Sequence, residues 1–449
     1  MKIITIKLYL WPIIIALLMF SFPIQVIMNS PLPSLLPYIG FILILLLTAK
    51  SYQFKNNFIF KNNNKINLMI SIYVILVIFQ GIWQTGLGFI SVGDLISSLI
   101  IYLFPISFYI YFSRYAIEKE IHIVLIVMII TGLISGLYFI YDSYLMLVFG
   151  EVSDFSIKMI EYSTMRATPD NAVNDARIAA FNRSHGLLEN HAVSASWISI
   201  SCFAMLALLP KKETLIRFLV IILYSIILLI ALNFTSIIAF SFIILFIELK
   251  GFLLFKALIA KSSLKALLVG MIAFVMAYNF NIQNQEGMAI IIRESIIGQI
   301  KLMTGNVEYK DNTFFYGFII SFVSFAENML SFPPGILIGE GFSSWGSNKG
   351  GDFGHAETLH QLGLPFYVAV IIGLFKLIKL SLYKIQILNL KIHAAGSYLY
   401  FAVCVLLYIL IATIHYSIWS TKSILPIFFI SIAFISRFLP SQTNQYRNK

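Results

Sequence analysis

The sequence predicts an all-α, polytopic integral membrane protein with about twelve transmembrane helices and two large outer segments. Three observations lead to this prediction: the apolar composition, the number of long apolar runs, and the uneven charge of the loops between them. Of the 449 residues, 59% are hydrophobic and 11% are charged, whereas soluble globular proteins carry about 25% charged residues. Too little charged surface remains for a water-soluble fold, so we expect the lipid bilayer to be a partner of this chain.

Twelve apolar runs approach or reach the length of about 17–25 residues that a membrane-spanning helix needs. The seventh and eighth runs are short and are separated only by a polar break around Asn233. The runs lie at roughly 8–28, 33–49, 66–85, 93–112, 122–143, 188–209, 215–232, 235–249, 263–280, 364–382, 396–416 and 420–437.

The distribution of lysine and arginine indicates an orientation, because these residues concentrate in cytoplasmic loops. With the N-terminus in the cytoplasm and alternating spans, 22 of the 31 basic residues fall inside, and 16 of the 20 acidic residues fall outside. We therefore expect one transmembrane domain over 1–449, with both termini cytoplasmic and with outer segments at 144–187 and 281–363. Counting the apolar run 313–338 as a span would reverse this pattern, so we expect a helix at the outer interface over 313–332.

Several classes of function are disfavoured by the sequence. Cys202 and Cys404 lie inside apolar runs and form neither a disulfide framework nor a metal-ligand set. The positive charge lies in short loops between spans, so we expect no nucleic-acid partner. No phosphate-loop or dinucleotide-binding glycine pattern is present, so we expect no cofactor.

The first outer segment ends in a group of polar residues where the sixth span begins. Arg177 and Arg183 offer permanent charge and planar sets of donors that suit a phosphate group at headgroup level. His185 and Asn190 follow within a few residues. The alternative is that these residues only anchor the span at the membrane interface.

The second outer segment contains a stretch with apolar residues at helical spacing and a glycine-rich loop. Arg293 lies on 286–303, which has apolar residues at helical spacing, and it could bind an anion or extend to the interface from a surface helix. The glycine-rich loop runs from Gly339 to Gly351 and is followed by His355, Glu357 and His360. Their spacing matches no zinc signature, so we expect no metal; a histidine and a carboxylate at the edge of a span favour proton transfer.

Three short stretches resemble the family of Wzy-type O-antigen polymerases and O-antigen ligases, which are bacterial inner-membrane glycosyltransferases. Residues 183–195 (RSHGLLENHAVSA) resemble the family's Arg-x-x-Gly segment and the following span start. Residues 336–343 (ILIGEGFS) resemble its Gly-x-Gly stretch, and 355–365 (HAETLHQLGLP) resemble the end of its outer loop. With the twelve-span layout, the resemblance covers nearly the whole chain.

The resemblance implies a polymerase that acts on oligosaccharide repeat units linked to undecaprenyl diphosphate and needs no nucleotide sugar. It implies His355 as general base, with Glu357 as the rival, and it leaves open a chain-length regulator protein as a further partner. An unperturbed glutamate is a weak base unless burial raises its pKa, and Glu357 could instead orient a histidine. The residues expected to bind substrate are Arg177, Arg183, His185, Asn190, Arg293 and His360.

Two departures favour the polymerase over the ligase. Seven residues separate His355 from Gly363, which is shorter than the spacing in ligases. The Ser-Arg pair that ligases often carry near the eighth span is absent from 235–237 (TSI). The ligase remains an alternative, and so does a transporter of lipid-linked oligosaccharides, although transporters usually show internal repeats and charges near the bilayer midplane.

Overall fold

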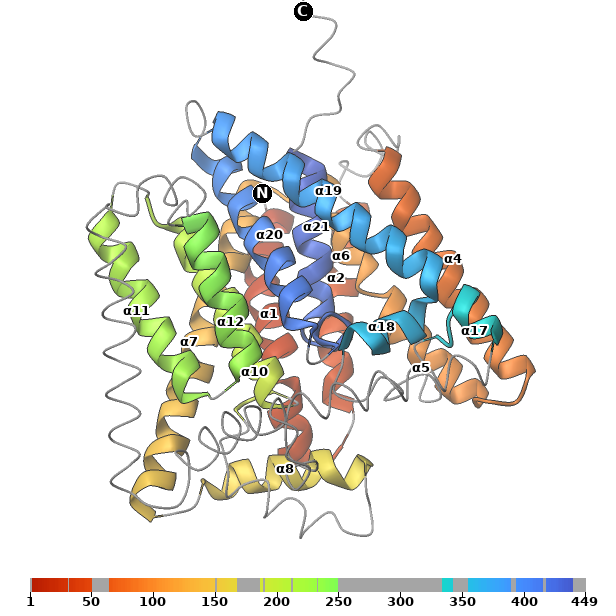
Figure 1. The fold of residues 1–449 in the computed structure, drawn as a ribbon, viewed down its shortest axis with the longest axis horizontal. Coiled ribbons are helices and arrows are strands. Elements are labelled where there is room, and N and C mark those ends of the chain that lie inside the picture. The colour runs from red at the N-terminus through yellow and green to blue at the C-terminus, as the bar shows by residue number, and fades with distance from the viewer. Residues whose placement is uncertain are drawn as a thin grey trace, which may run out of the picture. The chain divides into compact units, whose positions relative to one another are not determined.

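The computed structural model of the chain describes twelve stretches of residues (Figure 1). Within them the chain forms helices and connecting loops, and no strand. The described stretches are 2–30, 32–50, 64–149, 152–167, 186–188, 190–210, 213–231, 233–248, 333–341, 354–388, 393–414 and 417–438.

Most helices of the N-terminal half are apolar, and they range from 9 residues in α6 to 32 residues in α7. A capping box begins α5. The Ser91 hydroxyl accepts from the backbone amide of Asp94, and the Asp94 carboxylate accepts from the backbone amide of Ser91. The helices are α1 (Lys2–Met28), α2 (Leu36–Lys50), α4 (Asn64–Gly86), α5 (Val92–Leu103), α6 (Ile106–Arg114), α7 (Glu118–Phe149), α8 (Asp154–Ala167), α10 (His191–Leu208), α11 (Thr214–Ile230) and α12 (Phe234–Ile243).

The C-terminal half begins with two short helices and continues with three longer ones. Figure 1 shows α17, α18 and the start of α19 close together beside α4. The helices are α17 (Pro333–Ile338), α18 (Gly354–Leu362), α19 (Leu364–Leu388), α20 (His393–Ala412) and α21 (Leu425–Phe438).

Six candidate membrane spans occur among the described residues, so the chain is a helical membrane protein. Four shorter apolar helices lie at Leu36–Ala49, Thr214–Ile230, Gly396–Ala412 and Leu425–Phe438. The six candidate spans are Ile6–Met28, Ile66–Gly86, Val92–Arg114, Glu118–Met146, His191–Leu208 and Leu364–Ile385.

The helical fold class expected from the sequence is confirmed, and the total of twelve spans stays a prediction. Each of these six spans coincides with one of the expected apolar runs. The expected ninth span, 263–280, and the expected interfacial helix, 313–332, lie outside the described residues. The amphipathic helix expected at 286–303 lies outside them too.

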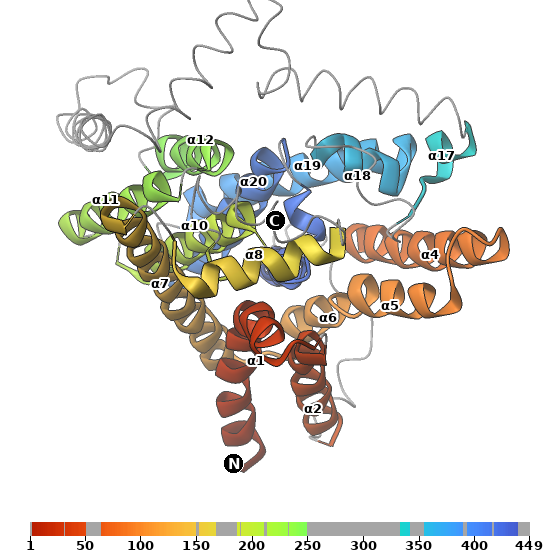
Figure 2. The same cartoon turned by 90° about the horizontal axis from the view of Figure 1, so that it is seen from below.

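The chain divides into two compact units. The first comprises 1–10, 40–122 and 317–449, and in it α21 packs against α6 and α20, and α4 packs against α5. Figure 2 shows α4 and α5 running side by side. The rings of Phe41 and Phe108 stack with their centroids 4.2 Å apart in the buried interior of this unit.

A buried ion pair joins the start of α1 to the start of α7 in the first unit. Lys7 Nζ lies 3.6 Å from Glu120 Oε1, and the two side chains are 1% and 0% exposed. The Tyr111 hydroxyl donates to the same carboxylate oxygen over 2.7 Å. At the turn between α6 and α7, Arg437 of α21 donates to the carbonyls of Phe112 and Ala116.

The second unit comprises 11–39 and 123–316, and its core is α10. Nearly every side chain of α10 is buried, including four serines. Gly132 of α7 allows the two helices to approach closely, because a Cβ there would lie 2.1 Å from the Cβ of Ser201. The indole of Trp197 donates to Thr131 over 3.0 Å and links the same two helices.

Candidate functional site

The short helix α18 carries all three titratable residues that the sequence singled out after the glycine-rich loop. His355 and Glu357 are half-buried on it, and His360 is fully buried. Gly363 ends the helix in a left-handed conformation with φ of 77°, and its amide donates to the carbonyl of Leu359 over 2.8 Å. The next residue, Leu364, begins the span in α19, so α18 lies directly at the end of a membrane-spanning helix.

Two hydrogen bonds fix the orientation of His355. Its Nε2 lies 3.0 Å from the carbonyl oxygen of Leu410, and its Nδ1 lies 3.0 Å from the hydroxyl of Tyr367. A carbonyl can only accept, so Nε2 carries the proton and Nδ1 accepts from Tyr367. Burial lowers the pKa of His355 below 6.5, and the hydrogen bond to Leu410 opposes this shift. His355 is therefore neutral at pH 7 and lies on a helix rather than on an exposed loop.

Glu357 differs from His355 in its partners and in its titration. Its Oε1 accepts from the side-chain amide of Gln361 over 3.0 Å. Burial raises the pKa of Glu357 from 4.5 to about 7. A carboxylate with a pKa of about 7 accepts a proton at neutral pH far more readily than an exposed carboxylate does. On the sequence alone, Glu357 could act as the base only with a raised pKa of this kind.

His360 lies beside a carboxylate that sequence reasoning did not single out. Its Nδ1 is 3.8 Å from Oε1 of Glu340, and both side chains are 0% exposed. Complete burial favours a structural role for His360, and its expected role in substrate binding stays a prediction. Glu340 stands between Gly339 and Gly341, so the resemblance of 336–343 to a Gly-x-Gly stretch was the one signal that could have found it.

The Gly339–Gly341 stretch pairs with the C-terminal end of α18. The amides of Glu340 and Gly341 donate to the carbonyls of His360 and Gln361 over 2.6 and 3.2 Å. These carbonyls have no partner inside the helix, because the last turn of a helix leaves its carbonyls unbonded. Gly339 and Gly341 adopt φ of 75° and 77°, which other residues rarely do. The glycines therefore allow the chain to lie directly against α18.

Gln80 of α4 joins these elements from inside a membrane span. Its side-chain amide donates to the carbonyl of Ile338 over 2.5 Å and to that of Gln361 over 2.8 Å. Gln80 is 3% exposed, and so is Gln84 one turn later. Sequence reasoning missed Gln80, although a buried amide within an apolar span is itself a signal, since polar groups are costly there.

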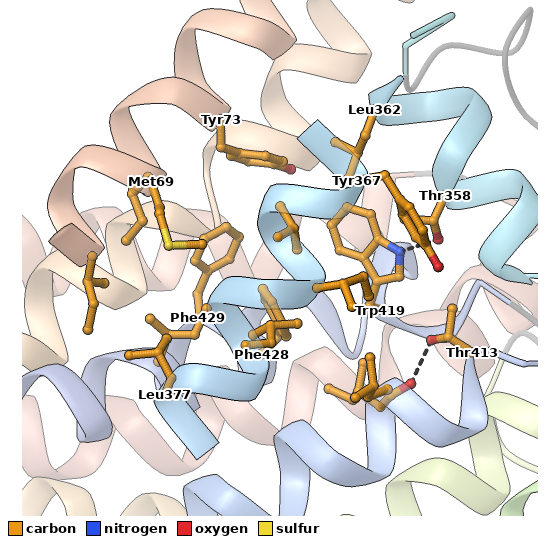
Figure 3. Close-up of a pocket in the computed structure, with 18 of the residues that line it drawn as sticks. Met69, Tyr73, Thr358, Leu362, Tyr367, Leu377, Thr413, Trp419, Phe428 and Phe429 are labelled. Carbon is orange, nitrogen blue, oxygen red and sulfur yellow. Dashed lines mark hydrogen bonds between the residues drawn. The ribbon is translucent and has the colours of Figure 1, made fainter. Parts of the chain in front are cut away.

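An apolar cavity of about 100 Å³ lies next to α18. Figure 3 shows Thr358, Tyr367 and Trp419 together on one side of it, and Met69, Leu377 and Phe429 on the other. The cavity is lined by Ile66, Met69, Ile70 and Tyr73 of α4, His355, Thr358 and Leu362 of α18, Tyr367, Val370, Ile371, Leu374 and Leu377 of α19, Ile409, Leu410 and Thr413 at the end of α20, and Trp419, Phe428, Phe429 and Ile432.

Of the remaining residues expected to bind substrate, the structure describes Asn190 alone. Arg177, Arg183, His185 and Arg293 lie outside the described residues. Asn190 caps α10, and its Oδ1 accepts from the backbone amide of Val193 over 2.9 Å. This helix cap gives Asn190 a structural role that the sequence did not predict.

Among the residues that the structure describes, no group of three or more His, Cys, Asp or Glu side chains could hold a metal ion. The titratable groups at and beside α18 include the carboxylate of Glu357, the imidazole of His355 and the phenol of Tyr367. No protein-family model matches the chain, and no curated protein or solved structure matches it either.

Proposed function

We propose that the protein is a membrane glycosyltransferase that polymerises oligosaccharide repeat units linked to a polyprenyl diphosphate. The observation that supports this most strongly is the juxtaposition at α18. A half-buried carboxylate and an imidazole lie at the end of a span, and the imidazole lines an apolar cavity at the same place. A reaction between two lipid-linked sugars needs a base beside a hydrocarbon-binding surface.

In the proposed reaction, a hydroxyl of one lipid-linked unit attacks the anomeric carbon of the sugar chain on another lipid. The bond from that carbon to the diphosphate oxygen breaks, and the polyprenyl diphosphate leaves with the electron pair. Glu357 or His355 takes the proton of the attacking hydroxyl. Of the two, Glu357 is the stronger candidate, because the Nδ1 of His355 already accepts a hydrogen bond from Tyr367.

In this proposal, His355 forms part of the surface that contacts the lipid. Held by Tyr367 and Leu410, it faces the cavity, whereas Glu357 does not line it. Arg183, with Arg177 and Arg293, is proposed to bind the diphosphate through charge-assisted hydrogen bonds. In this arrangement the base acts on the sugar hydroxyl and the arginines stabilise the leaving group.

The proposal is tested with purified protein, lipid-linked repeat units and glycan chain length as the readout. Polymer formed in detergent, without a second membrane compartment, supports an enzyme and contradicts a transporter. Loss of a general base typically lowers the rate by about 100- to 10,000-fold, so Glu357→Gln should abolish long polymer at matched protein level. If each of the three single variants, Glu357→Gln, His355→Ala and His360→Ala, makes normal polymer, α18 is not the catalytic centre.

We expect Arg183→Ala to abolish polymer at normal protein level. Arg183→Lys should restore it only in part, because lysine keeps the charge but loses the planar set of donors. Initial rates at several concentrations of the lipid-linked donor measure this effect. Full activity of Arg183→Ala would mean that the arginine serves only as an interfacial anchor.

A further inference from the structure

We infer that the cavity beside α18 binds one hydrocarbon chain, and that this chain is the isoprenoid tail of the carrier lipid. The identity of the lipid rests on the proposed function. The preference for a hydrocarbon chain does not rest on that function, because it follows from the lining and the shape of the cavity.

The polar groups that line the cavity already have hydrogen-bond partners inside the protein. The indole of Trp419 donates to Thr358 over 2.8 Å, and the hydroxyl of Thr413 donates to the carbonyl of Ile409 over 2.6 Å. The hydroxyl of Tyr73 donates to the carbonyl of Tyr102 over 3.3 Å. A polar ligand would give up hydrogen bonds to water and find no replacement here, whereas a hydrocarbon loses none.

The shape of the cavity favours a chain over a ring. Five lining residues of α19, from Tyr367 to Leu377, recur at three- and four-residue intervals and so share one helix face. Ten residues of helix extend over about 15 Å. The cavity volume of about 100 Å³ is smaller than the roughly 150 Å³ of an engineered cavity that holds benzene. A cavity about 15 Å long with a volume of about 100 Å³ is narrow, so it fits a single hydrocarbon chain better than a ring.

The position of the cavity favours the carrier lipid. Two of its walls, α4 and α19, contain candidate membrane spans, so the cavity lies where hydrocarbon chains are abundant. Its polar side is formed by residues of α18 and the start of α19, next to the proposed site of chemistry (Figure 3). A tail bound here would hold the diphosphate end of its lipid at α18.

The test uses photocrosslinking of the purified full-length protein in detergent. The probe is a farnesyl diphosphate analogue that carries a benzophenone on its isoprenoid tail, and the second arm uses a phosphatidylglycerol with a benzophenone on one acyl chain. We expect the isoprenoid probe to label peptides within 364–388 or 425–438, and unlabelled farnesyl diphosphate to compete for the site.

Two neighbouring substitutions on α19 provide a matched pair. Ile371 lines the cavity, whereas the neighbouring Ile372 does not line it and is 48% exposed on the surface of the protein. Ile371→Trp should fill the cavity and displace about two methylene groups of the tail, which predicts about tenfold weaker labelling. Ile372→Trp should label like the wild type. Val370→Phe fills the same cavity with a smaller change and replaces Ile371→Trp if that variant unfolds in a thermal melt.

Equal labelling of the wild type and both cavity-filling variants would overturn the inference. Labelling by the phospholipid that farnesyl diphosphate does not displace would overturn the isoprenoid assignment. Crosslinking requires neither sugar nor turnover, so it separates this inference from the proposed function. A protein that binds the tail without making polymer contradicts only the function, and normal polymer with unchanged labelling contradicts only the tail site.

Discussion

His355 and Glu357 lie two residues apart on α18, and burial shifts their pKa values in opposite directions. Burial disfavours the charged form of each group, so it lowers the pKa of the histidine and raises that of the glutamate. The pKa of Glu357, at about 7, therefore lies above that of His355, which burial holds below 6.5. Their titrations differ enough to identify the base.

A general base works only when deprotonated, so the rate should rise as the pH increases through the pKa of that base. If Glu357 is the base, the midpoint should lie at about 7. If His355 is the base, the midpoint should lie below 6.5, because its pKa is lowered from that value. Initial rates of polymerisation between about pH 5 and 9 measure this midpoint. A profile with no rise near pH 7 would contradict the assignment to Glu357.

Gly339 is required by the backbone at its position. A Cβ there would lie 2.4 Å from the carbonyl oxygen of Gln361, and the φ of 75° adds strain. Gly339→Ala should therefore destabilise the protein by more than the roughly 1–2 kcal/mol that the left-handed conformation alone costs. The melting temperature in detergent measures this effect.

Gly396→Ala is the matched control, because a Cβ at Gly396 in α20 would meet nothing within 4 Å. Alanine in a helix is favoured over glycine by roughly 0.5–1 kcal/mol, so this variant should melt at the same or a slightly higher temperature. A stable Gly339→Ala variant would show that the chain relaxes around α18.

At the scale of elements, α18 is held at its C-terminal end by two segments from elsewhere in the sequence. The Gly339–Gly341 stretch binds it through the backbone, and Gln80 of α4 binds it through a side chain. The position of α18 therefore depends on a membrane span that lies far away in the sequence.

Removal of the Gln80 amide should loosen this connection. Gln80→Leu removes this donor from the carbonyls of Ile338 and Gln361, but the carbonyl of Gln361 still accepts from the Gly341 amide. We therefore expect a cost of about 1–3 kcal/mol, for the Ile338 carbonyl alone. We expect a lower melting temperature and a reduced kcat. Thr85→Ala on the same helix is the control, since its hydroxyl donates only to Gly81 within the helix. Equal effects of both variants would argue against a connection specific to α18.

The apolar runs made the spans predictable, whereas the contacts around α18 were not. Periodicity and hydropathy place a helix, but they do not tell which buried glutamine meets which carbonyl. Gln80 and Gln361 are 281 positions apart, and only the packed fold brings them together. The sequence did place His355 and Glu357 at the end of a span. It could not give the pKa of Glu357, because burial sets that value.

At the scale of the whole molecule, the structure establishes the helices of the described residues, and the orientation of the chain in the membrane is a prediction. In a variant with Cys202 and Cys404 replaced by alanine, cysteines introduced at Asn174 and Ser347 should react with an impermeant thiol reagent in whole cells. A cysteine introduced at Asn62 should react only after the cells are opened. Labelling at Asn62 in intact cells would invert the predicted orientation.

The turn between α6 and α7 has a consequence for how the chain is assembled in the membrane. Glu120 at this turn binds Lys7 near the start of the chain, and Arg437 near its end donates to carbonyls at the same turn. During synthesis, the Lys7 ammonium has no carboxylate here until Glu120 is inserted, so it has to stay close to water or lipid headgroups. Arg437 can donate to this turn only after α21 has been synthesised, so this contact forms after α1, α6 and α7 have been made.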